Sequence, residues 1–209
     1  FFFFFFFFSL LAEVHSMEKA MDFQTVNALG RNCVMVACDD GDLMRLKYLV
    51  ENGGSLDVTD KSGYSCLHVA CNRNHYDVIK YLLDEGLNVN KKDYFKYTCI
   101  QYSCIGVDVK LNVLEMLLNA GADINAQNTY GFTPFMYICR SSIPAIKLML
   151  DRGSDWRMKN RQGLTGLDLA RRRGGKDVVE WLEEYINKLE VSEEKCKTAT
   201  INVLCVGKR

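Results

Sequence analysis

The cysteines are the first residues whose type and spacing could indicate chemistry, because thiolates bind metals and form disulfides. The chain has nine of them. Seven fall in two columns with a period near 33 residues: Cys33, Cys66 and Cys99, and Cys38, Cys71, Cys104 and Cys139. A zinc site needs four ligands at about 2.3 Å from one ion, whereas stacked helices lie about 8–10 Å apart. The spacing therefore favours small apolar filling of repeated positions over metal binding or disulfide formation.

The three histidines do not suggest a catalytic set. His15 lies near the N-terminus, and His75 follows a turn between two helical patterns. The plausible partners of His68 fall on repeated structural positions. The sequence has no G-x-x-x-x-G-K-[ST] phosphate loop, and Gly174-Gly175 fits a turn between helices. We therefore expect no independent enzyme activity and no cofactor.

The charges of the chain balance, with 26 Lys and Arg against 26 Asp and Glu. A net charge of zero excludes a generally basic nucleic-acid binder, so no nucleic-acid partner is expected. The hydrophobic content of 48% and the charged content of 25% are typical of a soluble globular chain. An odd number of cysteines without a convincing signal peptide favours a reducing compartment, the cytosol or the nucleus.

The two ends of the chain differ from the middle. Phe1 to Phe8 is a homopolymer, and its apolar stretch is shorter than the about 20 residues of a membrane helix. No membrane association is expected, and the missing basic n-region argues against a signal peptide. Residues 1–16 are interpreted as a low-complexity leader that is a gene-model artefact if Met17 is the true start, and 17–26 as a flank. Residues 190–209 leave the periodic pattern, and a mobile tail or a docking strand would fit them.

The period of the cysteines extends to whole segments of about 33 residues. The clearest runs from Asp60-Lys61-Ser62-Gly63-Tyr64-Ser65-Cys66-Leu67-His68-Val69-Ala70-Cys71 through Leu82-Leu83 to Gly86. Another contains Gly131-Phe132-Thr133-Pro134-Phe135. These segments resemble the ankyrin repeat, whose pattern is D-x-x-G-x-T-P-L-H-x-A-A followed by V-V-x-x-L-L-x-x-G-A-D. Five such segments occur in register: 27–59, 60–92, 93–127, 128–159 and 160–189.

The resemblance implies an all-α solenoid over residues 27–189, in which short β-hairpin-like loops join the repeats. We call the loop that begins each repeat its finger. Four hydroxyl residues are expected to cap the first helix of a repeat, and four glycines to follow the second helix: Ser65, Thr98, Thr133 and Thr165, and Gly53, Gly86, Gly121 and Gly153. Lys96 replaces the turn glycine of the third finger, which predicts that this finger is distorted.

One repeat cannot bury its apolar face alone, so the repeats must stack. The stacking face is predicted to be the column Val50, Leu83, Leu118 and Leu150. In the fifth repeat this column becomes Glu183, and the column of Cys38 becomes Arg171. Both changes are typical of a terminal capping repeat, which predicts that the array ends there.

Partners of ankyrin arrays usually meet the fingertips and the exposed face of the first helices. The resemblance therefore implies a protein-binding adaptor or scaffold, expected to be a monomer. The residues predicted to bind are Tyr64, Arg73, Tyr94, Phe95, Tyr97, Tyr130, Phe132, Arg140, Arg161, Arg172 and Arg173. The alternative for Tyr94 and Phe95 is that they fold inward over a distorted finger. The alternatives for the whole chain are a regulatory or substrate-recruiting part of a larger enzyme or channel, and a binder of an anionic ligand at its arginine-rich end.

Charge along the predicted binding face is uneven. The first repeat presents Arg31, Asp39 and Asp40, and the fifth presents Arg161, Arg172 and Arg173. This polarity predicts an acidic or phosphorylated partner at the C-terminal end, because guanidinium groups bind carboxylates and phosphates through two parallel hydrogen bonds.

Three further positions take a role from the resemblance alone. His68 is expected to link neighbouring loops by hydrogen bonds. Asn125, with Leu117 eight residues before it, looks like an ankyrin site of the asparaginyl hydroxylase of the oxygen-sensing pathway. Asn90 matches that site less well, and a purely structural role is the alternative for both asparagines.

Overall fold

The protein's structure is a computed structural model that describes residues 25–106 and 109–206, with side chains as far as Val191. Ten helices in this part form five pairs, one for each predicted repeat. The first helix of each pair, here called the inner helix, is α2 (Cys33–Asp40), α4 (Cys66–Arg73), α6 (Cys99–Cys104), α8 (Pro134–Ile138) or α10 (Gly166–Arg173). The second, outer helix is α3 (Leu43–Glu51), α5 (Tyr76–Asp84), α7 (Leu111–Asn119), α9 (Ile143–Asp151) or α11 (Lys176–Val206).

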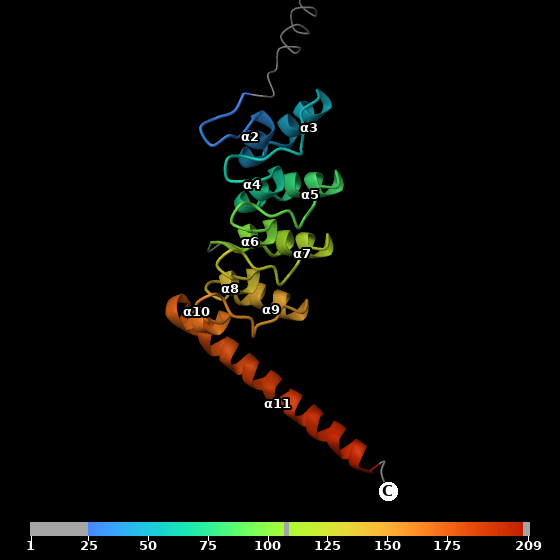
Figure 1. The fold of residues 1–209 in the computed structure, drawn as a ribbon, viewed down its shortest axis with the longest axis vertical. Coiled ribbons are helices and arrows are strands. Elements are labelled where there is room, and N and C mark those ends of the chain that lie inside the picture. The colour runs from blue at the N-terminus through green and yellow to red at the C-terminus, as the bar shows by residue number, and fades with distance from the viewer. Residues whose placement is uncertain (1–24, 107–108, 207–209) are drawn as a thin grey trace, which may run out of the picture.

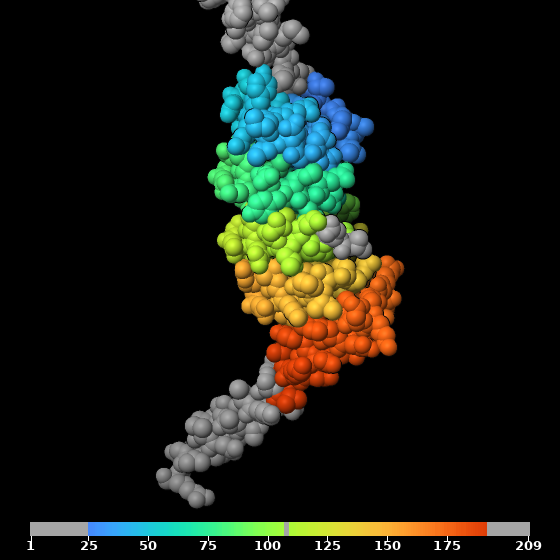
Figure 2. All heavy atoms as spheres, turned by 180° about the vertical axis from the view of Figure 1, so that it is seen from behind, coloured from blue at the N-terminus to red at the C-terminus, as the bar shows by residue number. Residues whose placement is uncertain are grey.

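The pairs are piled into an elongated stack (Figure 1). Each inner helix contacts the inner helix of the next repeat, from α2 through α4, α6 and α8 to α10, and the outer helices α3, α5, α7 and α9 do the same. Figure 2 shows the repeats as successive layers in chain order. This arrangement confirms the predicted all-α solenoid, in which each repeat buries its apolar surface against its neighbours.

Hydroxyl caps and glycines limit the helices as the sequence predicts. Ser65, Thr133 and Thr165 accept a hydrogen bond from the backbone of the first turn of α4, α8 and α10. The N–H of Thr98 donates to Oε1 of Gln101 at 2.9 Å, which closes a capping box at α6. The four predicted glycines after the outer helices have φ between 80° and 96°, a left-handed conformation that side chains disfavour: Gly53, Gly86, Gly121 and Gly153.

The cysteine columns lie inside the stack. Six of the seven repeat cysteines are buried, and Cys33 is half-buried. The two columns meet across repeat boundaries: a hydrogen bond with the Cys66 thiol, and then burial, raises the pKa of Cys38. Burial, and then the Cys99 thiol, raises the pKa of Cys71 in the same way. These protonated thiols fill positions where the inner helices approach each other.

The predicted stacking column is displaced by one residue. The fully buried column of the outer helices is Leu49, Leu82, Leu117, Met149 and Leu182, while Val50, Leu83, Leu118 and Leu150 are only half-buried. Successive residues of an α-helix point about 100° apart, so the predicted column, which lies one residue later in each helix, is at the flank of the buried face.

The fifth repeat has charged residues at two positions that are apolar in the other repeats. The two polar replacements noted in the sequence, Arg171 and Glu183, form an ion pair with Nε–Oε1 and Nη2–Oε1 distances of 2.9 Å and 2.8 Å. Leu182 keeps the buried place, so the column remains apolar where it packs. The backbone stays helical through Val206 in α11, which contradicts the docking-strand alternative for this segment.

All five fingers have the same turn. Each begins with Asn or Asp, whose Oδ1 accepts the N–H groups two and four residues later: Asn27, Asp60, Asp93, Asn128 and Asn160. In the third finger Lys96 adopts φ 62°, and its N–H bonds to the oxygen of Asp93 at 3.0 Å as Gly63 does to that of Asp60. The expected distortion of this finger was therefore wrong, because Lys96 adopts the glycine conformation at a cost in free energy.

This cost can be measured by exchanging residues between two fingers. Lys96→Gly should raise the free energy of unfolding by about 1 kcal/mol, since glycine adopts positive φ without steric conflict. The reverse change, Gly163→Lys at φ 75°, should lower the free energy of unfolding by a similar amount, because lysine disfavours this conformation. A Cβ at this position meets no atom within 4 Å, so no steric clash adds to the cost. Urea unfolding midpoints provide the measurement, and a Lys96→Gly protein less stable than the parent would contradict the assignment.

Candidate functional site

Three of the predicted aromatic residues are exposed at fingertips. Tyr94 is 72% exposed, Phe95 50% and Tyr130 51%. Backbone hydrogen bonds from each finger to the preceding one hold them in place: Tyr94 N–H to Ser62 oxygen at 3.2 Å, Thr129 N–H to Phe95 oxygen at 2.8 Å and Arg161 N–H to Tyr130 oxygen at 3.0 Å. The alternative in which Tyr94 and Phe95 fold inward is therefore wrong.

The other three predicted aromatics are half-buried in a ladder of rings. Tyr64, Tyr97 and Phe132 come from successive fingers, and Tyr102 and Tyr137 come from the inner helices α6 and α8. Neighbouring ring centroids lie 5.0 Å to 6.2 Å apart along the ladder. These distances suit stacked or tilted aromatic pairs, so the rings connect repeats two to four. They lie on the surface formed by the fingers and the inner helices, here called the inner face.

Sequence reasoning missed Tyr102 and Tyr137. The hydroxyl of Tyr102 donates to Oδ2 of Asp93 at 2.6 Å, and Nδ2 of Asn128 donates to the hydroxyl of Tyr137 at 3.0 Å. Burial raises the pKa of both phenols above the ordinary value of a tyrosine. Each tyrosine lies nine residues after the Asp or Asn that begins its finger, and this repeated spacing is the signal that could have found them.

The residues at the two ends of the aromatic ladder differ. The guanidinium carbon of Arg31 lies 6.0 Å from the centre of the Tyr64 ring at the N-terminal end. At the C-terminal end Leu169 takes the place of Tyr102 and Tyr137, and Nδ2 of the buried Asn160 has no partner in the described part of the chain. The aromatic ladder therefore stops at the fourth repeat.

An imidazole and an amide group link the third and fourth fingers to the inner helix of the preceding repeat. The N–H of Ser65 donates to Nδ1 of His68, so Nε2 carries the proton and donates to the Tyr97 oxygen at 3.2 Å. Gln101, at the same position of the next repeat, donates from Nε2 to the Phe132 oxygen at 2.7 Å. The predicted linking role of His68 is confirmed.

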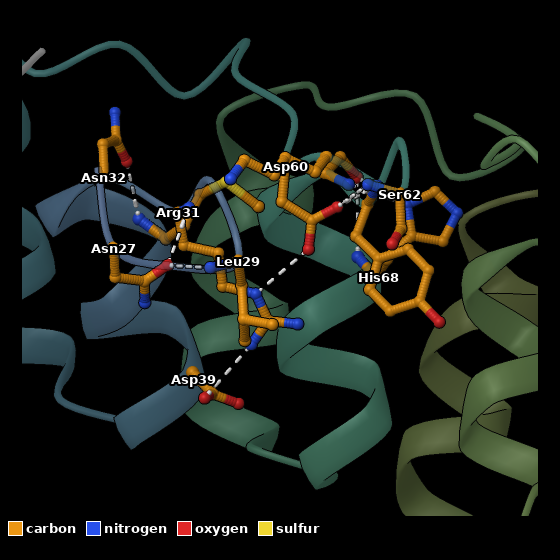
Figure 3. A network of polar contacts seen from close by, with 12 residues as sticks. Asn27, Leu29, Arg31, Asn32, Asp39, Asp60, Ser62 and His68 are labelled. Carbon is orange, nitrogen blue, oxygen red and sulfur yellow. Dashed lines mark hydrogen bonds and ion pairs between the residues drawn. The ribbon is translucent and has the colours of Figure 1, made fainter. Parts of the chain in front are cut away.

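Ion pairs occupy the N-terminal end of the inner face (Figure 3). Arg31 contacts Asp39 at 3.2 Å and Asp60 at 3.1 Å, and Nε of Arg73 donates to Oδ1 of Asp39 at 2.9 Å. Asp40 lies 3.7 Å from Arg45. Arg73 was predicted to bind a partner, but its side chain already holds a carboxylate of the neighbouring repeat.

The C-terminal arginines are different. All four predicted there are exposed, and within the described residues none has an ion pair or a side-chain hydrogen bond: Arg140, Arg161, Arg172 and Arg173. Arg140 and Arg173 line one hollow of about 310 Å³ together with Ile105, Tyr137 and Ser141. Arg161 lies at the fifth fingertip, and Arg172 is on α10.

Asn90 and Asn125 join the loops that follow the outer helices. Asn90 donates from Nδ2 to the Gly121 oxygen at 2.9 Å and accepts from the Asp123 N–H at 2.8 Å. Oδ1 of Asn125 accepts from the Asp155 N–H at 2.9 Å. Both contacts support the structural role that the sequence left as the alternative.

The described residues offer little other chemistry. They contain no group of three or more His, Cys, Asp or Glu side chains that could hold a metal ion. None of their helices is both long and apolar enough to cross a membrane. A second hollow of about 510 Å³ lies among the loops near Asp57 and Lys91, which form an ion pair of 2.7 Å with each other.

The fold and this surface define a helical repeat protein that presents fixed aromatic fingertips and arginines without an ion pair in the described part of the chain. A family model described as ankyrin repeats, in three copies, matches residues 7–93 and 102–192. The chain therefore belongs to the ankyrin-repeat family, whose repeats generally bind proteins and are typically non-catalytic. The match begins before Asn27, in part outside the described residues. A comparison with curated proteins gave no match.

The link through His68 predicts a dependence of stability on pH. Burial lowers the pKa of His68 from the ordinary value of about 6.5, although the hydrogen bond to Tyr97 and the charge of Asp93 oppose this. The unfolded chain then binds the proton at a higher pH than the folded chain. The contribution of this group to stability is complete above pH 6.5 and is lost as the pH falls through the folded value.

His68→Gln should remove this dependence and keep the hydrogen bond, because Gln101 makes the same bond one repeat later. The free energy of unfolding, measured with urea, should fall less between pH 7.5 and pH 5.5 for the variant than for the parent. The difference should be about 1.4 kcal/mol for each unit by which folding lowers the pKa of His68. The reciprocal variant Gln101→His should gain pH dependence. Identical pH profiles for His68→Gln and the parent would show that His68 does not titrate as described.

Proposed function

We propose that the protein is a non-catalytic adaptor or scaffold that binds a protein partner through its fingertips and the C-terminal part of its inner face. The observation that carries this proposal is the exposure of Tyr94, Phe95 and Tyr130 on fingers fixed by backbone hydrogen bonds. Exposed aromatic side chains that are already ordered bind at a low entropic cost, and tyrosine and arginine dominate the energies of protein interfaces.

The partner is proposed to be acidic or phosphorylated where it meets the fifth repeat. Three exposed arginines of the fifth repeat, and Arg140 of the fourth, form no ion pair with the described residues, whereas Asp39 and Asp60 already hold Arg31 and Arg73 at the other end. The cysteines of the repeats form no disulfide among the described residues, and their reduced thiols suit a reducing compartment, the cytosol or the nucleus. A monomer is proposed, because the apolar columns are buried within a single chain.

The fingertip contribution can be tested by capture of partners from a cell extract. The triple variant Tyr94→Ser, Phe95→Ser and Tyr130→Ser should lose more than tenfold in capture, since truncating one interface anchor costs about 2 kcal/mol. Tyr76→Ser, which removes a 41% exposed ring from the outer helix α5, is the matched control. Quantitative mass spectrometry of captured proteins measures both, and equal capture by the triple variant and the parent would contradict the proposal.

The arginine contribution has a separate test. Arg172→Glu with Arg173→Glu should not lower the free energy of unfolding by more than about 0.5 kcal/mol, because both side chains are exposed. The double variant should capture the partner at least tenfold less well, and added salt should weaken capture by the parent. Lys80→Glu with Lys176→Glu makes the same change in net charge on the outer helices. A partner that is indifferent to the arginine reversal and to salt would rule out the acidic or phosphorylated contact.

Asn125 is also proposed as a hydroxylation site. Its Oδ1 is bonded to Asp155, and hydroxylation of the side-chain carbon would leave this amide contact intact. Incubation with the asparaginyl hydroxylase and peptide mass spectrometry should show the gain of one oxygen at Asn125 and less at Asn90. Asn90 is bonded through both its amide oxygen and its amide nitrogen. Absence of any gain at Asn125 would end this proposal.

A further inference from the structure

Equivalent residues of successive repeats show what is unusual about the C-terminal hollow. At the end of each inner helix or in the turn that follows it, one column reads Asp39, Asn72, Ile105, Arg140 and Arg172, and the next reads Asp40, Arg73, Gly106, Ser141 and Arg173. Between repeats one and two, Arg73 of the second column donates to Asp39 of the first at 2.9 Å. At this boundary a residue of the second column therefore lies against the first-column residue of the preceding repeat.

Between repeats four and five the same two positions are both arginine. Arg173 stands where Arg73 stands, and Arg140 stands where Asp39 stands. Both line the hollow of about 310 Å³, and neither has a carboxylate among the described residues. Two like charges in one hollow repel each other, and the described lining of this hollow contains no carboxylate such as Asp39 at the N-terminal end.

We propose that the hollow between Arg140 and Arg173 binds the phosphate group of a phosphorylated side chain on the protein partner. This proposal rests on the proposed function and names the chemistry of its arginine contact. A phosphate carries about two negative charges and three acceptor oxygens, which match two guanidinium groups better than a single carboxylate does. Ile105 and Tyr137 in the same hollow provide apolar contact for the carbon chain that carries the phosphate.

A nucleic acid or a free anion would meet the same arginines, but the surroundings favour a peptide. The exposed ring of Tyr130 lies on the fourth finger, in the repeat that contains Arg140. The zero net charge of the chain provides no broad attraction for a polyanion. A peptide can place one phosphate in the hollow while its neighbouring side chains contact the finger.

The first experiment uses inorganic phosphate as the probe and the full chain as the protein. Thermal melts are compared in phosphate and in chloride at equal ionic strength and pH. The parent should melt about 3 to 5 °C higher when phosphate is in tenfold excess over its dissociation constant. Arg140→Asp places a carboxylate opposite Arg173, as Asp39 lies opposite Arg73. This variant should melt higher than the parent in chloride and gain nothing from phosphate.

Arg161→Asp is the matched control, because it makes the same change of charge at a fingertip outside the hollow. This variant should keep the gain from phosphate. Equal gains in the parent and in Arg140→Asp would show unspecific anion binding and overturn the site. Asp108 lies outside the described residues, and Asp108→Asn tests whether its carboxylate competes with phosphate for the two arginines. A gain in Asp108→Asn but not in the parent would also overturn a site for the partner's phosphate.

A second experiment separates phosphate from carboxylate. N-acetyl-phosphoserine methylamide and N-acetyl-glutamate methylamide are titrated against the parent, with binding followed by NMR of the arginine Nε–H groups. The phosphoserine probe should bind at least tenfold more tightly and shift Arg140 and Arg173. Equal affinities would contradict the phosphate assignment. Failure of either experiment would not change the result of the capture test with the fingertip variant. This proposal and the proposed function can therefore fail independently.

Discussion

The stack depends on hydrogen bonds that leave one repeat and end in the next. The second residue of each finger donates its N–H to the third residue of the preceding finger, as Tyr94 does to Ser62. His68 and Gln101 add side-chain bonds from an inner helix to the next finger. A repeat without its neighbour would leave these groups and the adjoining apolar columns without partners, so the fingers are fixed only when the repeats are stacked.

This constraint divides the polar and aromatic surface into two parts. Ring contacts within the ladder cover part of the side chains of Tyr64, Tyr97 and Phe132. The guanidinium groups of Arg31 and Arg73 form ion pairs with carboxylates of neighbouring repeats. What remains for a partner is the tips of the third and fourth fingers and the arginines of the last two repeats. The protein-binding face that we propose is therefore narrower than the set of exposed positions in an aligned repeat, and it lies toward the C-terminal end of the stack.

The sequence contained enough to predict the fold, because the period, the hydroxyl caps and the glycines after the outer helices are local and recur in register. It could not show which leucine of each pair is buried, since that depends on the rotation of a helix against its neighbours. Nor could it show that Lys96 would adopt the glycine conformation, because the surrounding finger imposes it. The sequence could not show the ion pair of Arg73 for a similar reason: its partner, Asp39, lies one repeat away, and only the stacking brings the two together.

The division of the arginines into bonded and unbonded groups is the central claim, and exchange of their Nε–H protons with water measures it directly. Nε donates to a carboxylate in Arg31, Arg73 and Arg171, at 2.9 Å to 3.1 Å. NMR of the free protein should therefore show slow exchange for these three residues and fast exchange for Arg140, Arg161, Arg172 and Arg173. Slow exchange at Arg140 and Arg173 in the absence of any ligand would contradict the account, because it would mean that the chain itself already fills the place assigned to the partner.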